Sequence, residues 1–337
     1  MRPRRVLVTG GAGFIGSHLT DLLLARGDAV TVVDSLTTGR RSNLPESHPR
    51  LRFIEACLAD ALGAFGHGER FDEIYHLAAA VGVRLVMEQP IAAIDTNVEQ
   101  TSALLRFAAE RGPGGAPCPT LIASSSEVYG KPDKQVFSED DDVVYGPTTK
   151  GRWSYACTKA IDEYLALAYH QQRGLPAVVA RFFNTVGPRQ VGAYGMVLPN
   201  FVEAAVAGRP LVVHGDGRQS RCFCDVRDVV RALPALLGSA GAPGRVFNVG
   251  ADEPVTILAL AELVVATLRS PSPVRLVPYD AVWTAGFEDL RHRRPDLTRL
   301  RAQISFRPER PLTDTILDLA AEIRARPARP APTEPRP

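Results

Sequence analysis

The chain has 337 residues, with 39 basic and 37 acidic side chains and a formal net charge of +2. A charge this close to zero argues against a nucleic-acid or membrane-surface protein, because either partner calls for an excess of positive charge. The basic residues are almost all arginine, and the lysines are Lys131, Lys134, Lys150 and Lys159. Few amines are therefore available for chemistry.

The cysteines and the N-terminus bear on the compartment. The five cysteines are odd in number and scattered along the chain, so they predict neither a disulfide framework nor a metal site. The apolar run after Arg5 is too short for a signal peptide, and no stretch reaches the roughly 18 apolar residues of a membrane span. We expect a cytoplasmic protein with no membrane partner.

The first half of the chain alternates short β-branched runs with segments of helical apolar spacing. Strands are predicted over residues 5–9, 29–34, 51–54, 73–77, 120–124 and 177–182, with a helix over 14–26. This alternation is typical of a parallel sheet covered by helices on both faces. It predicts an α/β fold with a Rossmann-type doubly wound parallel sheet of six or seven strands, in a cofactor-binding domain over residues 1–184.

After residue 184 the alternation weakens. Helices predicted over 201–207, 226–237 and 257–268 are separated by short strands over 211–214 and 246–249. These segments indicate a smaller α/β substrate-binding part, residues 185–326, packed on the carboxyl edge of the sheet. Residues 327–337 are rich in proline and lack apolar periodicity, so we expect a disordered tail.

A glycine-rich turn, T-G-G-A-G-F-I-G over residues 9–16, follows the first predicted strand. Glycines at these positions permit a tight turn, and they bring backbone N–H groups against a pyrophosphate at the positive end of the following helix. The turn therefore predicts a dinucleotide site. Its expected contacts are Gly10, Gly13, Phe14, Ile15 and Gly16.

Asp34 ends the second predicted strand, where its carboxylate can accept hydrogen bonds from ribose hydroxyls. A 2′-phosphate at this place would meet a negative charge. The pattern therefore favours NAD over NADP as the cofactor, although Arg40 and Arg41 follow closely.

Tyr155 and Lys159 lie four residues apart in a segment of helical spacing, so both project from one face of a helix. A tyrosine with a pKa of about 10 is a poor base near neutrality. A neighbouring ammonium and the positive nicotinamide favour the phenolate. The pair can then deprotonate a secondary alcohol while hydride leaves to NAD⁺.

The spacing of the three glycines, together with further segments, resembles the extended short-chain dehydrogenase/reductase family, which modifies nucleotide sugars. The resemblance covers about residues 5–310 and is carried by H-L-A-A at 76–79, Asn97, S-S-S-E-V-Y-G at 124–130, the Tyr155/Lys159 pair and R-F-F-N at 181–184. It implies that Leu77, Ala78, Ala79 and Asn97 also contact the cofactor, and that Ser125 hydrogen-bonds the alcohol oxygen.

One position departs from that family. Ala56-Cys57 stands where the family usually has a Gly-Asp pair that holds the adenine. We therefore expect the adenine contact to come from backbone or from elsewhere rather than from Asp60.

Two more segments resemble UDP-glucuronate decarboxylases. K-G-R-W-S-Y at 150–155 and Q-S-R-C-F-C-D-V at 219–226 are similar to the decarboxylase domain of the bacterial bifunctional enzyme of aminoarabinose synthesis. The resemblance implies that Ser126, Glu127 and Arg221 act at the sugar carboxylate. Glu127, together with either Ser126 or a bound water, is the candidate to protonate C5. The implied substrate contacts are Asn184, Arg189, Val197, Leu198, His214, Arg221 and Arg293, with Arg293 and Arg189 at the diphosphate.

The resemblance implies NAD-dependent decarboxylation of UDP-glucuronate, by C4 oxidation, loss of CO₂ and re-reduction, to UDP-xylose or a UDP-4-keto-pentose. The alternative is a UDP-sugar 4-epimerase acting on UDP-glucuronate or UDP-glucose. A non-catalytic NAD-binding protein on the same fold fits less well, because both Tyr155 and Lys159 are present. Helices near 97–110 and 155–173 resemble those that pair in homodimers of the family, so a homodimer is expected.

Overall fold

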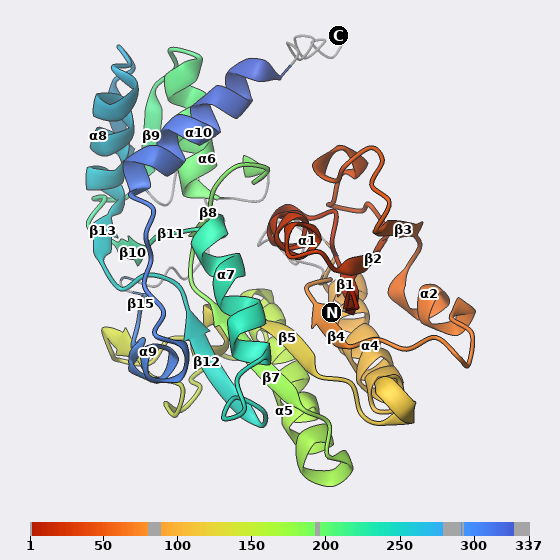
Figure 1. The fold of residues 1–337 in the computed structure, drawn as a ribbon. Coiled ribbons are helices and arrows are strands. Elements are labelled where there is room, and N and C mark those ends of the chain that lie inside the picture. The colour runs from red at the N-terminus through yellow and green to blue at the C-terminus, as the bar shows by residue number, and fades with distance from the viewer. Residues whose placement is uncertain (1, 80–88, 193–195, 279–290, 292, 327–337) are drawn as a thin grey trace, which may run out of the picture.

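The computed structural model describes residues 2–79, 89–192, 196–278, 291 and 293–326 (Figure 1). Its centre is a sheet of seven strands, all paired in parallel, in the order β12-β7-β5-β4-β1-β2-β3. The strands are β1 (Arg5–Thr9), β2 (Ala29–Asp34), β3 (Leu51–Glu55), β4 (Glu73–His76), β5 (Thr120–Ser125), β7 (Ala177–Phe182) and β12 (Arg245–Val249).

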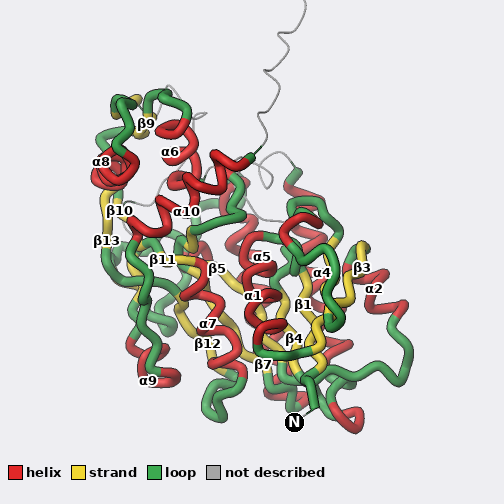
Figure 2. The backbone as a smooth tube through the Cα atoms, turned by 45° about the horizontal axis from the view of Figure 1, so that its top comes forward, coloured by secondary structure: helices red, strands yellow, loops and turns green. Residues whose placement is uncertain are grey.

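Helices cover both faces of this sheet, and Figure 2 shows the strands running between them. One core joins the sheet to α1 (Phe14–Ala25), α7 (Val226–Leu237) and α9 (Thr298–Ile304). The other core joins it to α2 (Leu58–Ala64), α4 (Pro90–Ala108) and α5 (Ser154–Arg173). Strands buried on both faces require nearly continuous apolar runs, such as the Val-Leu-Val of β1.

The strand order confirms the predicted Rossmann-type doubly wound fold. Chain order reverses between β1 and β4, so the connections after these two neighbouring strands leave in opposite directions. A crevice opens at such a point, outside the carboxyl ends of the strands. The fold therefore places any ligand at the residues that directly follow β1, β4 and β5.

A smaller layer lies beyond these carboxyl ends, at the upper left of Figure 1. Its core packs α6 (Val197–Val206), α8 (Ile257–Leu268) and α10 (Leu312–Ala325) with the parallel pair β9 (Leu211–His214) and β14 (Val274–Val277). Short strand pairs connect it to the rest: β10 (Ser220–Cys222) with β13 (Pro254–Thr256), β8 (Thr185–Val186) with β11 (Cys224–Asp225), and β6 (Val136–Phe137) with β15 (Arg294–Pro295). No helix in the described ranges is long and apolar enough to cross a membrane.

The expectation that residues 226–237 and 246–249 belong to the smaller part is wrong. The helix over 226–237 is α7, which packs on the large sheet, and residues 246–249 lie in β12, which pairs with β7 at the edge of that sheet. Residues 183–225 are inserted between β7 and these two elements, so the strand–helix alternation of the large sheet is interrupted in the sequence and continues with α7 and β12. Residue 184 is therefore not a boundary between two domains. The predicted tail over 327–337 lies outside the described residues.

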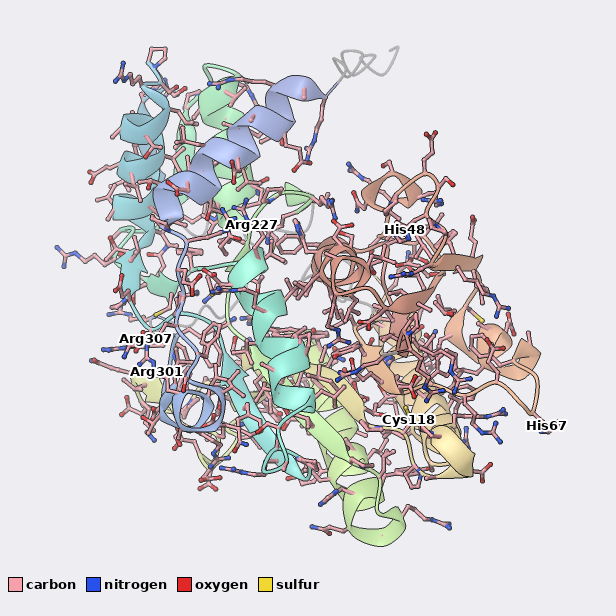
Figure 3. The ribbon with its side chains drawn as sticks, in the orientation of Figure 1. His48, His67, Cys118, Arg227, Arg301 and Arg307 are labelled. Atoms are coloured by element: carbon pink, nitrogen blue, oxygen red, sulfur yellow. The ribbon has the colours of Figure 1, made fainter. Side chains whose placement is uncertain are left out.

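Arg227 at the start of α7 holds the two layers together (Figure 3). Its guanidinium pairs with Asp225 at 2.7 Å and reaches Asp318 of α10 at 2.6 Å. Thr315 of α10 donates to the same Asp225 carboxylate at 2.7 Å. The buried Asp225 carboxylate thus joins the start of α7 to α10 in addition to the short strand pairs.

If β12 is part of the core of the large sheet, truncating its buried aromatic side chain should destabilise the folded protein. Phe247 is fully buried among α7 and β7 residues. Phe247→Ala should lower the free energy of unfolding by about 3–5 kcal/mol, through lost burial and the cavity left behind. Leu276→Ala is the control, since Leu276 is 54% exposed and should change it by less than about 1 kcal/mol. Equal effects in denaturant unfolding would contradict the assignment.

Candidate active site

A large cleft opens between the carboxyl ends of the strands and the smaller layer, with a volume of about 1150 Å³. Sites for one small ligand usually measure about 300–1,000 Å³, so this cleft is large enough for two ligands side by side. Most of the residues predicted from the sequence line it. They are Gly10, Gly13, Phe14, Ile15, Gly16, Asp34, Leu77, Ala78, Ala79, Ser125, Ser126, Glu127, Tyr155, Lys159, Asn184, Val197, Leu198, His214, Arg221 and Arg293.

The glycine turn after β1 fits a dinucleotide. Gly10 has a φ of +68°, and a side chain there would place its Cβ 2.7 Å from the backbone nitrogen of Ala78. At Gly16 a Cβ would lie 2.1 Å from the carbonyl oxygen of Gly10. Helix α1 begins directly after Gly13, with no capping side chain among the described residues. Its first N–H groups therefore remain available to a phosphate.

Asp34 is held in place at the end of β2. Its Oδ2 accepts from the backbone N–H of Ala12 at 2.9 Å, and its Oδ1 accepts from that of Leu36 at 2.8 Å. Arg41 points into its own loop, where its guanidinium donates to backbone carbonyls of residues 44–46. The fixed carboxylate and the occupied arginine both favour a ribose with a free 2′-hydroxyl, as NAD has.

At the adenine end, Ala56, Cys57 and Leu58 line the cleft. The Cys57 thiol donates to the Asp60 carboxylate at 2.9 Å. Asp60 is not among the residues lining the cleft. Which residues contact the adenine stays a prediction.

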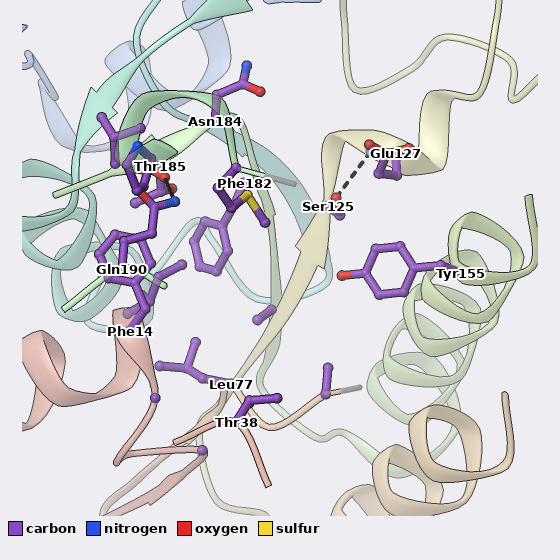
Figure 4. Close-up of a pocket in the computed structure, with 18 of the residues that line it drawn as sticks. Phe14, Thr38, Leu77, Ser125, Glu127, Tyr155, Phe182, Asn184, Thr185 and Gln190 are labelled. Atoms are coloured by element: carbon purple, nitrogen blue, oxygen red, sulfur yellow. Dashed lines mark hydrogen bonds between the residues drawn. The ribbon is translucent and has the colours of Figure 1, made fainter. Parts of the chain in front are cut away.

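Tyr155 projects from the first turn of α5 across the cleft, toward Ser125 at the end of β5 (Figure 4). Ser125 Oγ accepts the backbone N–H of Glu127 at 3.2 Å, which fixes the hydroxyl. Burial raises the pKa of Tyr155, the charges of Glu127 and Asp162 raise it further, and the hydrogen bond with Ser125 lowers it. The free protein thus keeps Tyr155 protonated, and it depends on added positive charge to make it a base.

Lys159 lies one turn further along α5 and is 3% exposed. Its Nζ donates to the carbonyl of Ala123 at 3.1 Å and to Asp162 Oδ2 at 3.0 Å. An ammonium has three hydrogens, so one remains to face the cleft that Lys159 lines. The predicted Tyr155/Lys159 face is therefore present.

Three arginines converge on one carboxylate beside Ser125. Glu127 lies 2.7 Å from Arg293 and 3.5 Å from Arg152, and Arg221 is close enough to act on its charge. Burial alone would raise the pKa of Glu127, but these arginines outweigh it and hold the pKa below its usual value. Glu127 and all three arginines line the cleft at this place.

Two expectations concern these side chains, and both stay predictions. Arg293 is expected at the diphosphate, and its guanidinium lies 2.7 Å from Glu127. Glu127, with Ser126 or a bound water, is expected to protonate C5. Because the arginines lower the pKa of Glu127, the water is the better proton donor of these.

Two predicted contacts lie outside the cleft. Asn97 is buried between α4 and α5, where its Nδ2 donates to Thr158 at 3.3 Å. Arg189 has a φ of +67° and pairs with Asp21 of α1 at 2.7 Å. Neither is among the residues that line the cleft. Within the described ranges no group of three His, Cys, Asp or Glu side chains is placed to hold a metal.

Several lining residues were not predicted individually. Arg152 stood within the 150–155 segment but received no role, although its place three residues before Tyr155 puts it on the same helical face. Thr38, Arg209, Gln219 and Phe223 also line the cleft. These residues lie in loops or on short strands whose sequence carries no periodic signal, so pattern alone could not place them.

Comparisons with known proteins agree with this geometry. Residues 6–250 match the NAD dependent epimerase/dehydratase family. The chain is 40% identical to UDP-N-acetyl-alpha-D-glucosaminuronate decarboxylase of Bacillus cytotoxicus, over 93% of this chain and 97% of that protein. It is 34% identical to UDP-glucuronic acid decarboxylase 1 of Arabidopsis thaliana, over 96% of this chain and 70% of that protein.

Solved structures give the same picture of the fold. UDP-N-acetylglucosamine 4-epimerase from Methanobrevibacter ruminantium, in complex with UDP-N-acetylmuramic acid, superposes with a TM-score of 0.84 at 28% identity, over 96% of this chain and 99% of that one. The UDP-glucose 4-epimerase of Thermus thermophilus, in complex with NAD, gives 0.80 at 30% identity, over 95% of this chain and 99% of that one.

The glycine turn leads to a binding prediction. Gly10→Ala should weaken NAD binding by at least about tenfold, because the new Cβ meets the Ala78 backbone and the left-handed φ is strained. Gly63→Ala is the matched control, since nothing lies within 4 Å of a Cβ there. Isothermal titration calorimetry measures both. Equal affinities in the two variants would contradict the assigned turn.

Proposed function

The chain belongs to the NAD-dependent epimerase/dehydratase family, and we propose that within it this protein decarboxylates a UDP-linked hexuronate, UDP-glucuronate in the first place. The observation that carries the proposal is the cluster of Arg152, Arg221 and Arg293 around Glu127, two residues beyond Ser125. All three guanidinium groups line the cleft, where they are complementary to a sugar with a carboxylate at C5. A neutral hexose, the substrate of a simple 4-epimerase, offers them no charge.

The oxidation step assigns roles to three side chains. Tyr155, as phenolate, accepts the proton of the C4 hydroxyl, Ser125 donates a hydrogen bond to the C4 oxygen, and Lys159 supplies positive charge beneath the phenolate. The glycine turn and Asp34 would hold NAD, which would supply the hydride acceptor for oxidation at C4 and the hydride donor for the later reduction. The protein's part is to hold C4 against Tyr155 and to keep water out of the step.

Decarboxylation follows from the ketone at C4. The bond from C5 to the carboxylate carbon breaks, CO₂ leaves, and the electron pair moves into the C4 oxygen as an enolate that Tyr155 and Ser125 stabilise. C5 then needs a proton. Since Glu127 is ionised, we assign it with Ser126 to orienting a water that donates this proton, and Arg221 to orienting the leaving carboxylate.

A second substrate is favoured by one observation. The Bacillus cytotoxicus relative, at 40% identity, acts on a UDP-N-acetylglucosaminuronate, whereas the UDP-glucuronic acid decarboxylases are 32–35% identical. The two sugars differ at C2 only, away from the carboxylate, C4 and C5. The chemistry proposed for Tyr155 and the arginine cluster is therefore the same for both.

We further infer a homodimer in the cytoplasm. Helices α4 and α5 pack side by side on one face of the sheet and expose large apolar side chains: Ile91 is 76% exposed, Ile94 39%, Ile161 43% and Tyr164 71%. A second copy of the same helix pair would cover them. The cytoplasmic location stays a prediction from the sequence.

The product of turnover tests the proposal. Enzyme with NAD⁺ and UDP-glucuronate, or in parallel UDP-N-acetylglucosaminuronate, should release CO₂ and form a UDP-pentose or UDP-4-keto-pentose. Mass spectrometry and NMR identify the product, and the ratio of kcat/KM for the two sugars selects the substrate. UDP-galacturonate formed without CO₂ would instead establish a 4-epimerase.

Removing the base should stop turnover. Tyr155→Phe should lower kcat by at least about 100-fold while NAD binding is kept, because the variant loses only the hydroxyl that accepts the proton. Tyr164→Phe on the same helix is the control, since Tyr164 is 71% exposed and faces away from the cleft. Lys159→Ala and Ser125→Ala should also be inactive. Normal turnover in Tyr155→Phe would refute the assignment of the base.

A further inference from the structure

A row of buried polar side chains runs behind the cofactor side of the cleft, from β1 to α5. Thr9 Oγ1 lies 2.7 Å from His76 Nδ1, and His76 Nε2 lies 3.1 Å from Thr101 Oγ1. Thr101 lies near Asp162 and acts to lower the pKa of its carboxyl. None of these four side chains is exposed by more than 1%. Buried polar groups of this kind are retained only when each has a partner.

The backbone N–H of Ala78 donates to Thr9 Oγ1 at 3.3 Å, which ties the row to the loop after β4. Burial, with the charge of Lys159, lowers the pKa of His76 to about 3, so the ring is neutral. A neutral imidazole donates from one ring nitrogen and accepts at the other, so His76 links the two threonine hydroxyls.

Asp162 Oδ2 accepts from Lys159 Nζ at 3.0 Å, and both side chains are buried. Burial raises the pKa of Asp162 overall, while Lys159 and Thr101 act to lower it. An ammonium at this distance favours the charged carboxylate. The polar row that begins at Ala78 thus reaches Thr101, beside the pair of Asp162 and the lysine of the catalytic pair.

Asp162 itself does not line the cleft and touches no reacting atom. We propose that Asp162 is a positioning residue that holds the Lys159 ammonium and offsets part of its charge, and so sets the pH range in which Tyr155 accepts a proton. The proposal rests on the roles proposed above for Tyr155 and Lys159. It does not depend on decarboxylation, because 4-epimerisation would begin with the same proton transfer.

The other charged groups near this place have different partners. Glu127 faces Tyr155 from the cleft side but is held by arginines, and Glu163, next to Asp162, pairs with the buried Arg181 at 2.7 Å. His76 is neutral. Asp162 is therefore the acidic group whose charge can be removed without changing the walls of the cleft. Its charge raises the pKa of Tyr155, so its loss should lower that pKa.

The decisive variant is Asp162→Asn, which keeps the shape and removes the charge. Because Tyr155 acts as a base, kcat should rise with pH. The pH at which this rise reaches half of the maximal kcat should fall by about one unit in the variant. Asp162→Glu, which restores the charge, should move it back toward the wild-type value. A shared loss of thermal stability in both variants with no change in the pH profile would mean a structural role only and would overturn the proposal.

Two threonine variants provide a milder test and its control. Thr101→Val removes the hydroxyl that stabilises the Asp162 anion, so it should shift the pH profile in the same direction by a smaller amount. Thr158→Val is the matched control, because Thr158 is equally buried and adjacent to Lys159 but donates to the carbonyl of Tyr155 instead. If Asp162→Asn does not fold, an unshifted Thr101→Val overturns the proposal.

A direct titration keeps this test separate from the test of function. With ¹³C-labelled tyrosine in the NAD-loaded protein, and the resonance assigned through Tyr155→Phe, NMR measures the pKa of Tyr155 without turnover. Asp162→Asn should lower it. If the product is an epimer, the proposed function fails while this shift is still observed. If the folded variant titrates as the wild type does, the role of Asp162 fails whatever the product is.

Discussion

The contact between the loops that follow β1 and β4 is the constraint on which the rest of the molecule depends. These strands are neighbours at the point where chain order reverses, and Gly10 lies so close to the backbone of Ala78 that no side chain fits between them. The absence of that one Cβ lets the turn close and α1 begin at the crevice. It also aligns Thr9 with His76, from which the buried polar row starts.

The rest of the cleft is lined by residues at the carboxyl ends of the other strands. Asp34 ends β2, Ser125 ends β5, and Asn184 follows β7, so each lies at the same edge of the sheet. The opposite wall includes Arg221 of β10 and Arg293, which directly precedes β15, and both lie in segments that connect the smaller layer to the sheet. The predicted cofactor contacts and these two arginines therefore come from different parts of the fold, which the pair of Arg227 and Asp225 helps to join.

Residues tied to a regular pattern were predictable from the sequence, and the others were not. The glycine turn, Asp34 and the Tyr155/Lys159 pair follow from strand and helix periods, and the structure brings them into one cleft. Asn97 belongs to a similar pattern, but its side chain faces the α4–α5 contact, which no period reveals. Arg293 and Glu127 each suggested a separate role. Only their distance of 2.7 Å shows that they act on each other.

The place of β12 has a consequence for how such a chain is made and how it can change. The sheet that carries the cofactor is completed by a strand that leaves the ribosome after most of the substrate wall, since residues 183–225 come first. Until then β7 is paired with β5 only, and its other side is an open edge of the sheet. Recombination that replaces the substrate wall must likewise cut the gene twice, before residue 183 and again ahead of α7, or the sheet loses its last strand.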